Sequence, residues 1–151
     1  MRKTLVIGMM AAFMAVCLLG GFAGAGRTVT VKKKFAAGPH APAPVLTDVD
    51  PNGCMNTVEG VNKTTVEYHT PKKGTFTAKI FNFSGDWDLY VTNRKDAVLG
   101  SSHADQTVEG APTKETVVVK LPANYHVKVV ACNWLGSSPT ADGIYTFKYR
   151  R

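Results

Sequence analysis

The clearest strand pattern in the chain is Ser84-Gly85-Asp86-Trp87-Asp88-Leu89-Tyr90-Val91-Thr92. Polar and apolar residues alternate along it with a period of two, which is typical of a β-strand with one buried face. In an extended chain one face holds Trp87, Leu89 and Val91, and the other holds Asp86, Asp88 and Tyr90. The first face predicts one wall of a hydrophobic core. The second face begins with two carboxylates roughly 7 Å apart.

The chain is long enough for one domain with attachments, at 151 residues. Its formal charge is +7, with 18 Lys and Arg against 11 Asp and Glu. Without Arg2 and Lys3 of a removable leader, 16 basic residues remain and the net charge is +5. A diffuse excess of this size favours solubility and weak attraction to anionic surfaces. No recognised nucleic-acid module is visible, so we expect no nucleic-acid partner.

The first 25 residues have the pattern of a secretory signal peptide. Arg2 and Lys3 are followed by the uncharged apolar segment Leu5 to Leu19 and by the small-residue site Ala23-Gly24-Ala25. Cleavage after Ala25 predicts a secreted or cell-envelope protein without a membrane span. The alternative is an uncleaved anchor, because residues 5–25 are just long enough to cross a bilayer.

Residues 26–50 are expected to form a basic, Ala/Pro-rich linker, with at most a short strand at Thr28 to Val31. Alternating Ala and Pro at residues 36–44 favours an extended spacer. Residues 51–151 then form the predicted folded domain.

Further segments in this domain alternate in the same way, and Gly, Pro and Asn turns separate them. In residues 75–83 the alternation breaks its phase, which predicts a bulge near Ile80 and Phe81. Residues 93–113 show no period and are expected to be a loop. The pattern predicts an all-β, antiparallel β-sandwich. The other candidate strands are residues 64–69, 75–83, 115–121, 125–132 and 144–149.

The order of these strands resembles the bacterial pre-peptidase C-terminal domain family. The resemblance lies in Gly85 to Val91, Lys114 to Val117, Pro122 to Val130 and Gly143 to Phe147. Asn124 stands where the family's hairpin usually has Gly, a small departure because Asn tolerates a left-handed turn. The resemblance implies a jelly-roll-like sandwich that is non-catalytic and attaches to a protein or polymer, here as a stand-alone copy.

Two cysteines, Cys54 and Cys132, remain after the leader. In an exported chain an even pair predicts a disulfide. No CxxC motif or activating partner points to a reactive thiol.

Asp86, Asp88 and Glu115 are the candidate metal ligands, because Ca²⁺ prefers oxygen donors. Relatives in the family are linked to calcium, so Ca²⁺ is the one cofactor expected. The alternative is that Asp86 caps a turn and Asp88 hydrogen-bonds a neighbouring loop. The histidines are scattered without metal-binding spacing.

Aromatic side chains are the candidates for a binding surface. Tyr90 lies on the outward face of its predicted strand, and Trp134 follows Cys132 in a predicted loop. Such rings stack on sugars or on side chains of a partner. The alternative for Trp134 is packing over the disulfide.

No nucleophile motif is present, so no catalytic residue and no enzyme activity are expected. The predicted function is a secreted binding or accessory module for an extracellular protein or polysaccharide surface. Two alternatives stay open: a chaperone-like or inhibitory partner of a separately encoded secreted protease, and a small secreted hydrolase.

Overall fold

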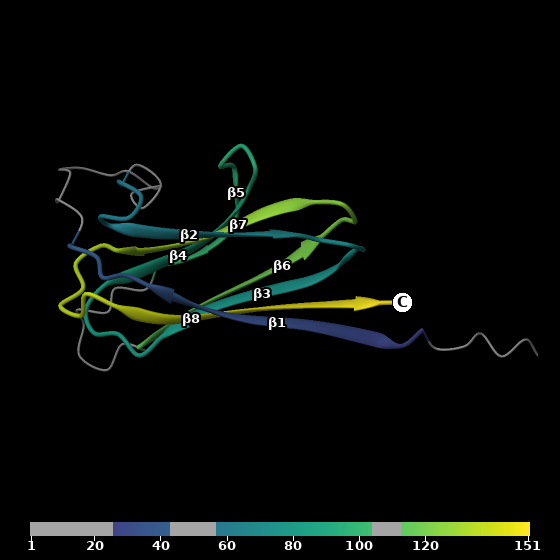
Figure 1. Cartoon of the computed structure of the whole chain (residues 1–151), viewed down its shortest axis with the longest axis horizontal. Coiled ribbons are helices and arrows are strands. Elements are labelled where there is room, and N and C mark those ends of the chain that lie inside the picture. Colours follow the sequence, from purple (N-terminus) through teal and green to yellow (C-terminus); the bar gives the residue numbers. More distant parts are fainter. Residues whose placement is uncertain (1–25, 43–56, 104–112) are drawn as a thin grey trace, which may run out of the picture.

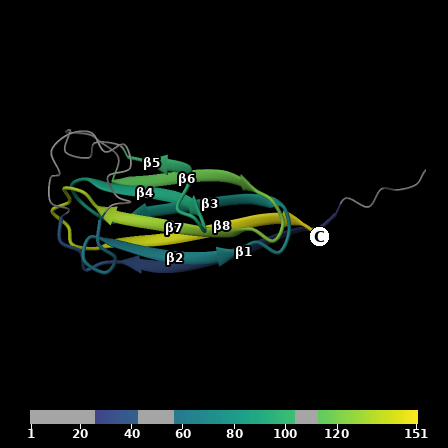
Figure 2. The same cartoon turned by 90° about the horizontal axis from the view of Figure 1, so that it is seen from above.

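The computed structural model describes residues 26–42, 57–103 and 113–151, and these residues form two packed β-sheets (Figures 1 and 2). One sheet has the strand order β1-β8-β3-β6 and the other β2-β7-β4-β5, with every neighbouring pair antiparallel. The predicted all-β antiparallel sandwich is confirmed. The strands are β1 (Thr28–Ala37), β2 (Lys63–His69), β3 (Gly74–Phe81), β4 (Trp87–Asn93), β5 (Val98–Ser102), β6 (Lys114–Leu121), β7 (His126–Asn133) and β8 (Ala141–Arg150).

The pairing follows a long hairpin that is rolled up. Strands β1 and β8 pair, as do β2 and β7, β3 and β6, and β4 and β5. Alternate pairs lie in opposite sheets, which is the wrapped arrangement of an eight-stranded jelly roll. Within the described ranges, no helix is long and apolar enough to cross a membrane.

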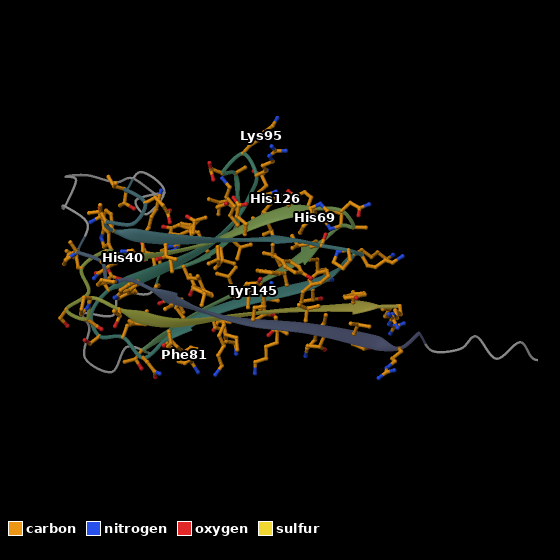
Figure 3. The ribbon with its side chains drawn as sticks, in the orientation of Figure 1. His40, His69, Phe81, Lys95, His126 and Tyr145 are labelled. Carbon is orange, nitrogen blue, oxygen red and sulfur yellow. The ribbon has the colours of Figure 1, made fainter. Side chains whose placement is uncertain are left out.

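The core lies between the two sheets, where the inward rows of both meet. Trp87, Leu89 and Val91 of β4 are fully buried, as the alternation predicts. Across the gap, Phe76 of β3 stacks on Tyr145 of β8 with ring centroids 5.4 Å apart. In Figure 3, Tyr145 points into the space between the layers, whereas Phe81 lies on the outer side.

The prediction of a linker over residues 26–50 is partly wrong, because residues 28–37 form β1 and pair with all of β8. Its Val31, Phe35 and Ala37 contribute to the core, while the lysines between them keep their charges in water. The run of lysines hides this alternation, since Lys33 occupies an inward position near the sheet edge. Residues 43–50 of the predicted linker, and the leader, lie outside the described residues.

Two local predictions are also corrected. Residues 98–102, expected to be a loop, form β5 at the edge of the second sheet. Strand β3 pairs without a register shift from Gly74 to Phe81, so it has no bulge. The phase instead breaks where the strand ends, because Asn82 has a φ of 59° and turns Phe83 back into the core.

Strand β4 is buried on both faces. Asp88 and Tyr90, on the face opposite the core, are 7% and 3% exposed, and Tyr90 clusters with Val130 and Cys132 of β7. Cys132 is itself disulfide-bonded. Cys54 lies outside the described residues, so its pairing with Cys132 stays a prediction.

Candidate functional site

The three carboxylates singled out in the sequence interact in the fold, and we call Asp86, Asp88 and Glu115 the acidic cluster. Asp86 and Asp88 flank the start of β4, and Glu115 is an inward residue of β6 that is 1% exposed. Burial, together with the negative charges of Asp86 and Glu115, raises the pKa of Asp88 to about 7. A hydrogen bond with Tyr90 opposes these effects.

The acidic cluster does not by itself form a calcium site. Across residues 26–42, 57–103 and 113–151, no three His, Cys, Asp or Glu side chains converge in a way that could hold a metal ion. Ca²⁺ takes six to eight oxygen ligands, so it would need further donors at this cluster. Asp105, a further carboxylate in the sequence, lies outside the described residues. Calcium binding therefore stays a prediction. What the geometry shows is a buried carboxyl group, Asp88, and its burial raises its pKa.

The two aromatic candidates have different surroundings. The prediction that Tyr90 belongs to a binding surface is wrong. The outer side of β4 is covered, and the Tyr90 ring is buried against Val130. Trp134 is partly exposed, and its main-chain N–H donates to the carbonyl of Asp86 at 2.9 Å. The neighbouring Leu135 is 44% exposed.

A buried polar network supports this end of β4, and the sequence did not indicate it. The Asn133 amide donates to the carbonyls of His40, Gly136 and Ser138 at 3.2–3.3 Å, and its Oδ1 accepts from the Gly136 N–H at 2.6 Å. The Trp87 indole donates to the same Ser138 carbonyl at 3.1 Å.

His40 belongs to this network although it comes from the Ala/Pro-rich segment. Its ring lies 6.0 Å from that of Trp87, and its Nε2 lies 2.7 Å from the Thr64 hydroxyl. Burial lowers the pKa of His40, and the charge of Glu59 acts in the opposite direction. The proline-rich composition around His40 predicts a spacer, which concealed its structural role.

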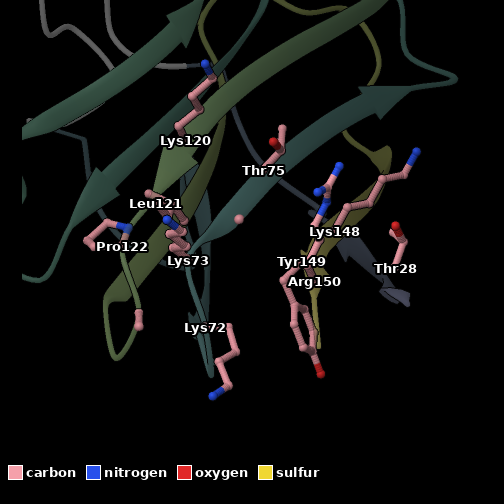
Figure 4. A pocket seen from close by; sticks show the side chains of 12 residues that line it. Thr28, Lys72, Lys73, Thr75, Lys120, Leu121, Pro122, Lys148, Tyr149 and Arg150 are labelled. Atoms are coloured by element: carbon pink, nitrogen blue, oxygen red, sulfur yellow. The ribbon is translucent and has the colours of Figure 1, made fainter. Parts of the chain in front are cut away.

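A basic pocket of about 950 Å³ lies where β3, β6 and β8 meet at one end of the sandwich (Figure 4). Its cations come from three parts of the chain, and its apolar lining comes mainly from Leu121, Pro122 and Ala123. Among the residues that the structure describes, the lining contains no Asp, Glu or His. The cations, which define the basic pocket below, are Lys72, Lys73, Lys120, Lys148 and Arg150.

Thr70 fixes the turn that brings Lys72 and Lys73 to this pocket. It is fully buried, and its hydroxyl donates to the Pro122 carbonyl at 2.7 Å and accepts from the Tyr125 N–H at 2.9 Å. Its main chain also bonds Asn124 and Tyr125. Asn124 has a φ of 54°, the left-handed turn expected at this position. The β2–β3 and β6–β7 turns are therefore tied together.

Sequence reasoning did not find the basic pocket, because its lysines are far apart in the chain. Lys72 and Lys73 looked like ordinary turn residues, and Lys120 and Lys148 like solvated positions on strands. Only the pairing of β3 with both β6 and β8 brings them together.

Comparisons with known proteins identify no family. No family model matches the chain, and no curated protein matches it. Among solved structures, PliG of Aeromonas hydrophila, a periplasmic inhibitor of g-type lysozyme, is 12% identical with a TM-score of 0.42. That match covers 85% of this chain and 91% of PliG. A cyclase from Fischerella sp. TAU is also 12% identical, with a TM-score of 0.34, over 58% of this chain and 55% of the cyclase. Likenesses at this level carry no argument about fold or function.

Proposed function

We propose that this protein is a secreted, non-catalytic binding module that attaches to an anionic group on an extracellular protein or polymer. The basic pocket carries the proposal. It gathers five cations around an apolar floor, and its lining holds no acid that would neutralise them. A site with this charge attracts anions and raises their local concentration.

The chemistry of the lining favours binding over catalysis. It consists of Lys, Arg, Thr, Tyr and small or apolar residues. In the described part of the chain, it has no His, Cys or carboxylate that could act as a nucleophile or a general base near neutral pH. Lysine and arginine side chains bind carboxylate or phosphate groups through charge-assisted hydrogen bonds.

Membership of the pre-peptidase C-terminal domain family and an extracytoplasmic location belong to the same proposal. They rest on the strand motifs and on the leader pattern of the sequence. A Cys54–Cys132 disulfide would suit such a location. Calcium binding at the acidic cluster is a separate proposal, because the basic pocket does not depend on it.

The pocket is tested by titrating the ¹⁵N-labelled protein with inorganic phosphate and with succinate at low salt. We expect saturable chemical-shift changes at Gly74, Thr75 and Tyr149, and these changes should be lost in the Lys72→Gln/Lys73→Gln variant. The matched control is Arg94→Gln/Lys95→Gln, which removes the same charge from an exposed turn of the other sheet.

Absence of saturable shifts at the pocket, or equal loss of binding in both variants, would overturn the proposal. Co-purification of a protease from culture medium would favour an inhibitory partner instead. Turnover of a substrate by the pure protein would favour a hydrolase.

A further inference from the structure

The outer face of the β1-β8-β3-β6 sheet carries a strong excess of positive charge. Core residues such as Phe76, Ala78 and Phe147 point inward, so alternate residues of each strand form this outer face. The only carboxylate among its outward residues is Asp142, which accepts a hydrogen bond from Asn82 at 2.7 Å. The cations, which define the cationic face, are Lys32, Lys34, Lys79, Lys114, Lys120, Lys148 and Arg150.

Strand register places one uncharged residue, Thr75 or Ile144, between cations that share a row. In one row, Thr75 lies between Lys148 and Lys120. Rows of outward residues follow each other about 7 Å apart along a strand, and neighbouring strands are about 4.8 Å apart. Such alternation keeps like charges from standing directly opposite each other. The cations thus form a spaced array rather than a single cluster.

Within residues 26–42, 57–103 and 113–151, no ion pair neutralises this array. Of the residues that the structure describes, those in ion pairs are His126 with Glu67 and Lys128 with Asp96, all outside the cationic face. The basic pocket opens at one end of the face, because Lys120, Lys148 and Arg150 belong to both. The pocket and the face are therefore one continuous positive surface.

We propose that a linear acidic polysaccharide binds along the cationic face, with one of its anionic groups in the basic pocket. The inference rests on the proposed function and names the ligand class. Spaced cations match anions that repeat along a polymer. Threonine hydroxyls between the cations donate and accept hydrogen bonds, which suits the hydroxyl groups of sugars.

Two other anionic partners fit this face less well. Single-stranded nucleic acid binds through aromatic stacking platforms as well as charge, and the face has one aromatic residue, Phe81, at a corner beside Asp142. A lipid surface is usually bound with Trp or large apolar side chains inserted among the headgroups. The outward rows of these four strands contain neither Trp nor Tyr, and their large aliphatic residues, Ile144 and Val118, lie singly in different rows beside Lys79 and Thr77.

Strand β1 offers a matched pair of substitutions. Lys34 lies on the cationic face, whereas the exposed Lys33 is paired with Tyr145 and belongs to the opposite row. The face variant is Lys32→Gln/Lys34→Gln/Lys79→Gln, and the control is Lys33→Gln/Arg94→Gln/Lys95→Gln. Both triple variants lose three positive charges, so they have the same net charge. Thermal melting checks that each is folded.

Binding is measured by calorimetry with polygalacturonate, a linear uronate polymer, and with neutral dextran of matched length. We expect saturable binding to polygalacturonate, and none to dextran. The face variant should bind on the order of tenfold more weakly, and the control within about twofold of the natural chain. Affinity should fall as salt rises, with a shallower dependence in the face variant.

Three results would overturn the inference. One is equal weakening of the two triple variants, which would mean that only net charge matters. Another is tighter binding to a single-stranded oligonucleotide or to anionic lipid vesicles than to polygalacturonate. The third separates this inference from the proposed function: succinate still binds the pocket in a Lys72- and Lys73-dependent way, yet the face variant binds polygalacturonate normally. In that case the pocket stands and the extended face does not.

Discussion

Ser102 and Glu115 join the two sheets at the edge where β5 and β6 face each other. The Ser102 hydroxyl donates a hydrogen bond to Oε2 of Glu115, and its Oγ lies 3.4 Å from the main-chain nitrogen of Thr116. Each residue comes from an edge strand of a different sheet. Glu115 is 1% exposed, so its carboxylate depends on donors from the protein.

Ser102→Ala should destabilise the fold by about 1–3 kcal/mol, because it removes a hydroxyl donor from a buried carboxylate. The measurement is urea unfolding followed by tryptophan fluorescence. Ser101→Ala is the control, since Ser101 is an exposed neighbour in the same strand. Equal stability of the two variants would show that the hydrogen bond does not contribute to folding.

Protonation of Asp88 should make stability fall as the pH rises. The pKa of Asp88 is about 7 in the folded protein, against an ordinary value of 3.8. The folded state therefore holds this proton more tightly, and its stabilising contribution is full below about pH 4. The contribution is lost as the pH rises through 7, and the unfolding free energy falls in total by an amount on the order of 4 kcal/mol.

Asp88→Asn should flatten this pH dependence, because an amide does not titrate in this range. It should be more stable than the natural chain at pH 8, whereas the exposed Asp142→Asn should change little. The measurement is the unfolding free energy at pH 4, 6 and 8. The raised pKa would be contradicted if the unfolding free energy of the natural chain rose between pH 4 and 8 and Asp88→Asn had the same pH dependence.

Calcium gives a separate test of the acidic cluster. If Ca²⁺ binds there, millimolar Ca²⁺ should raise the melting temperature at pH 7, and Asp88→Ala should abolish the shift. Bound Ca²⁺ should also release the Asp88 proton and reduce the pH dependence. The calcium prediction is wrong if Ca²⁺ leaves the melting temperature unchanged while lowering the pH still raises it.

Thr70→Val should weaken both the fold and the basic pocket. Valine has a similar shape but cannot bond the Pro122 carbonyl or the Tyr125 N–H, so we expect a loss of about 1–3 kcal/mol. Succinate binding should weaken as the Lys72–Lys73 turn loosens. The exposed Thr113→Val is the control. Unchanged stability and binding in Thr70→Val would show that the turns do not need this residue.

Period-two alternation by itself determined the class of fold. Trp87, Leu89 and Val91 mark a core wall in any extended chain, because successive side chains point to opposite faces. The sequence also singled out Asp86, Asp88 and Glu115, which interact in the structure. The sequence pattern did not predict the whole of β1 or any of β5. Lysines obscure the alternation in β1, and serines and a glycine obscure it in β5, so pairing with a neighbouring strand decides that these residues are extended.

Burial of Tyr90 and the gathering of the basic residues were decided only by tertiary structure. One strand pattern cannot show what covers its second face, and Tyr90 looked exposed for that reason. Lys72, Lys120 and Lys148 lie far apart in the chain and meet because β3 pairs with both β6 and β8. Local sequence sets which face a side chain takes, whereas strand register sets its neighbours, and that register depends on contacts between distant residues.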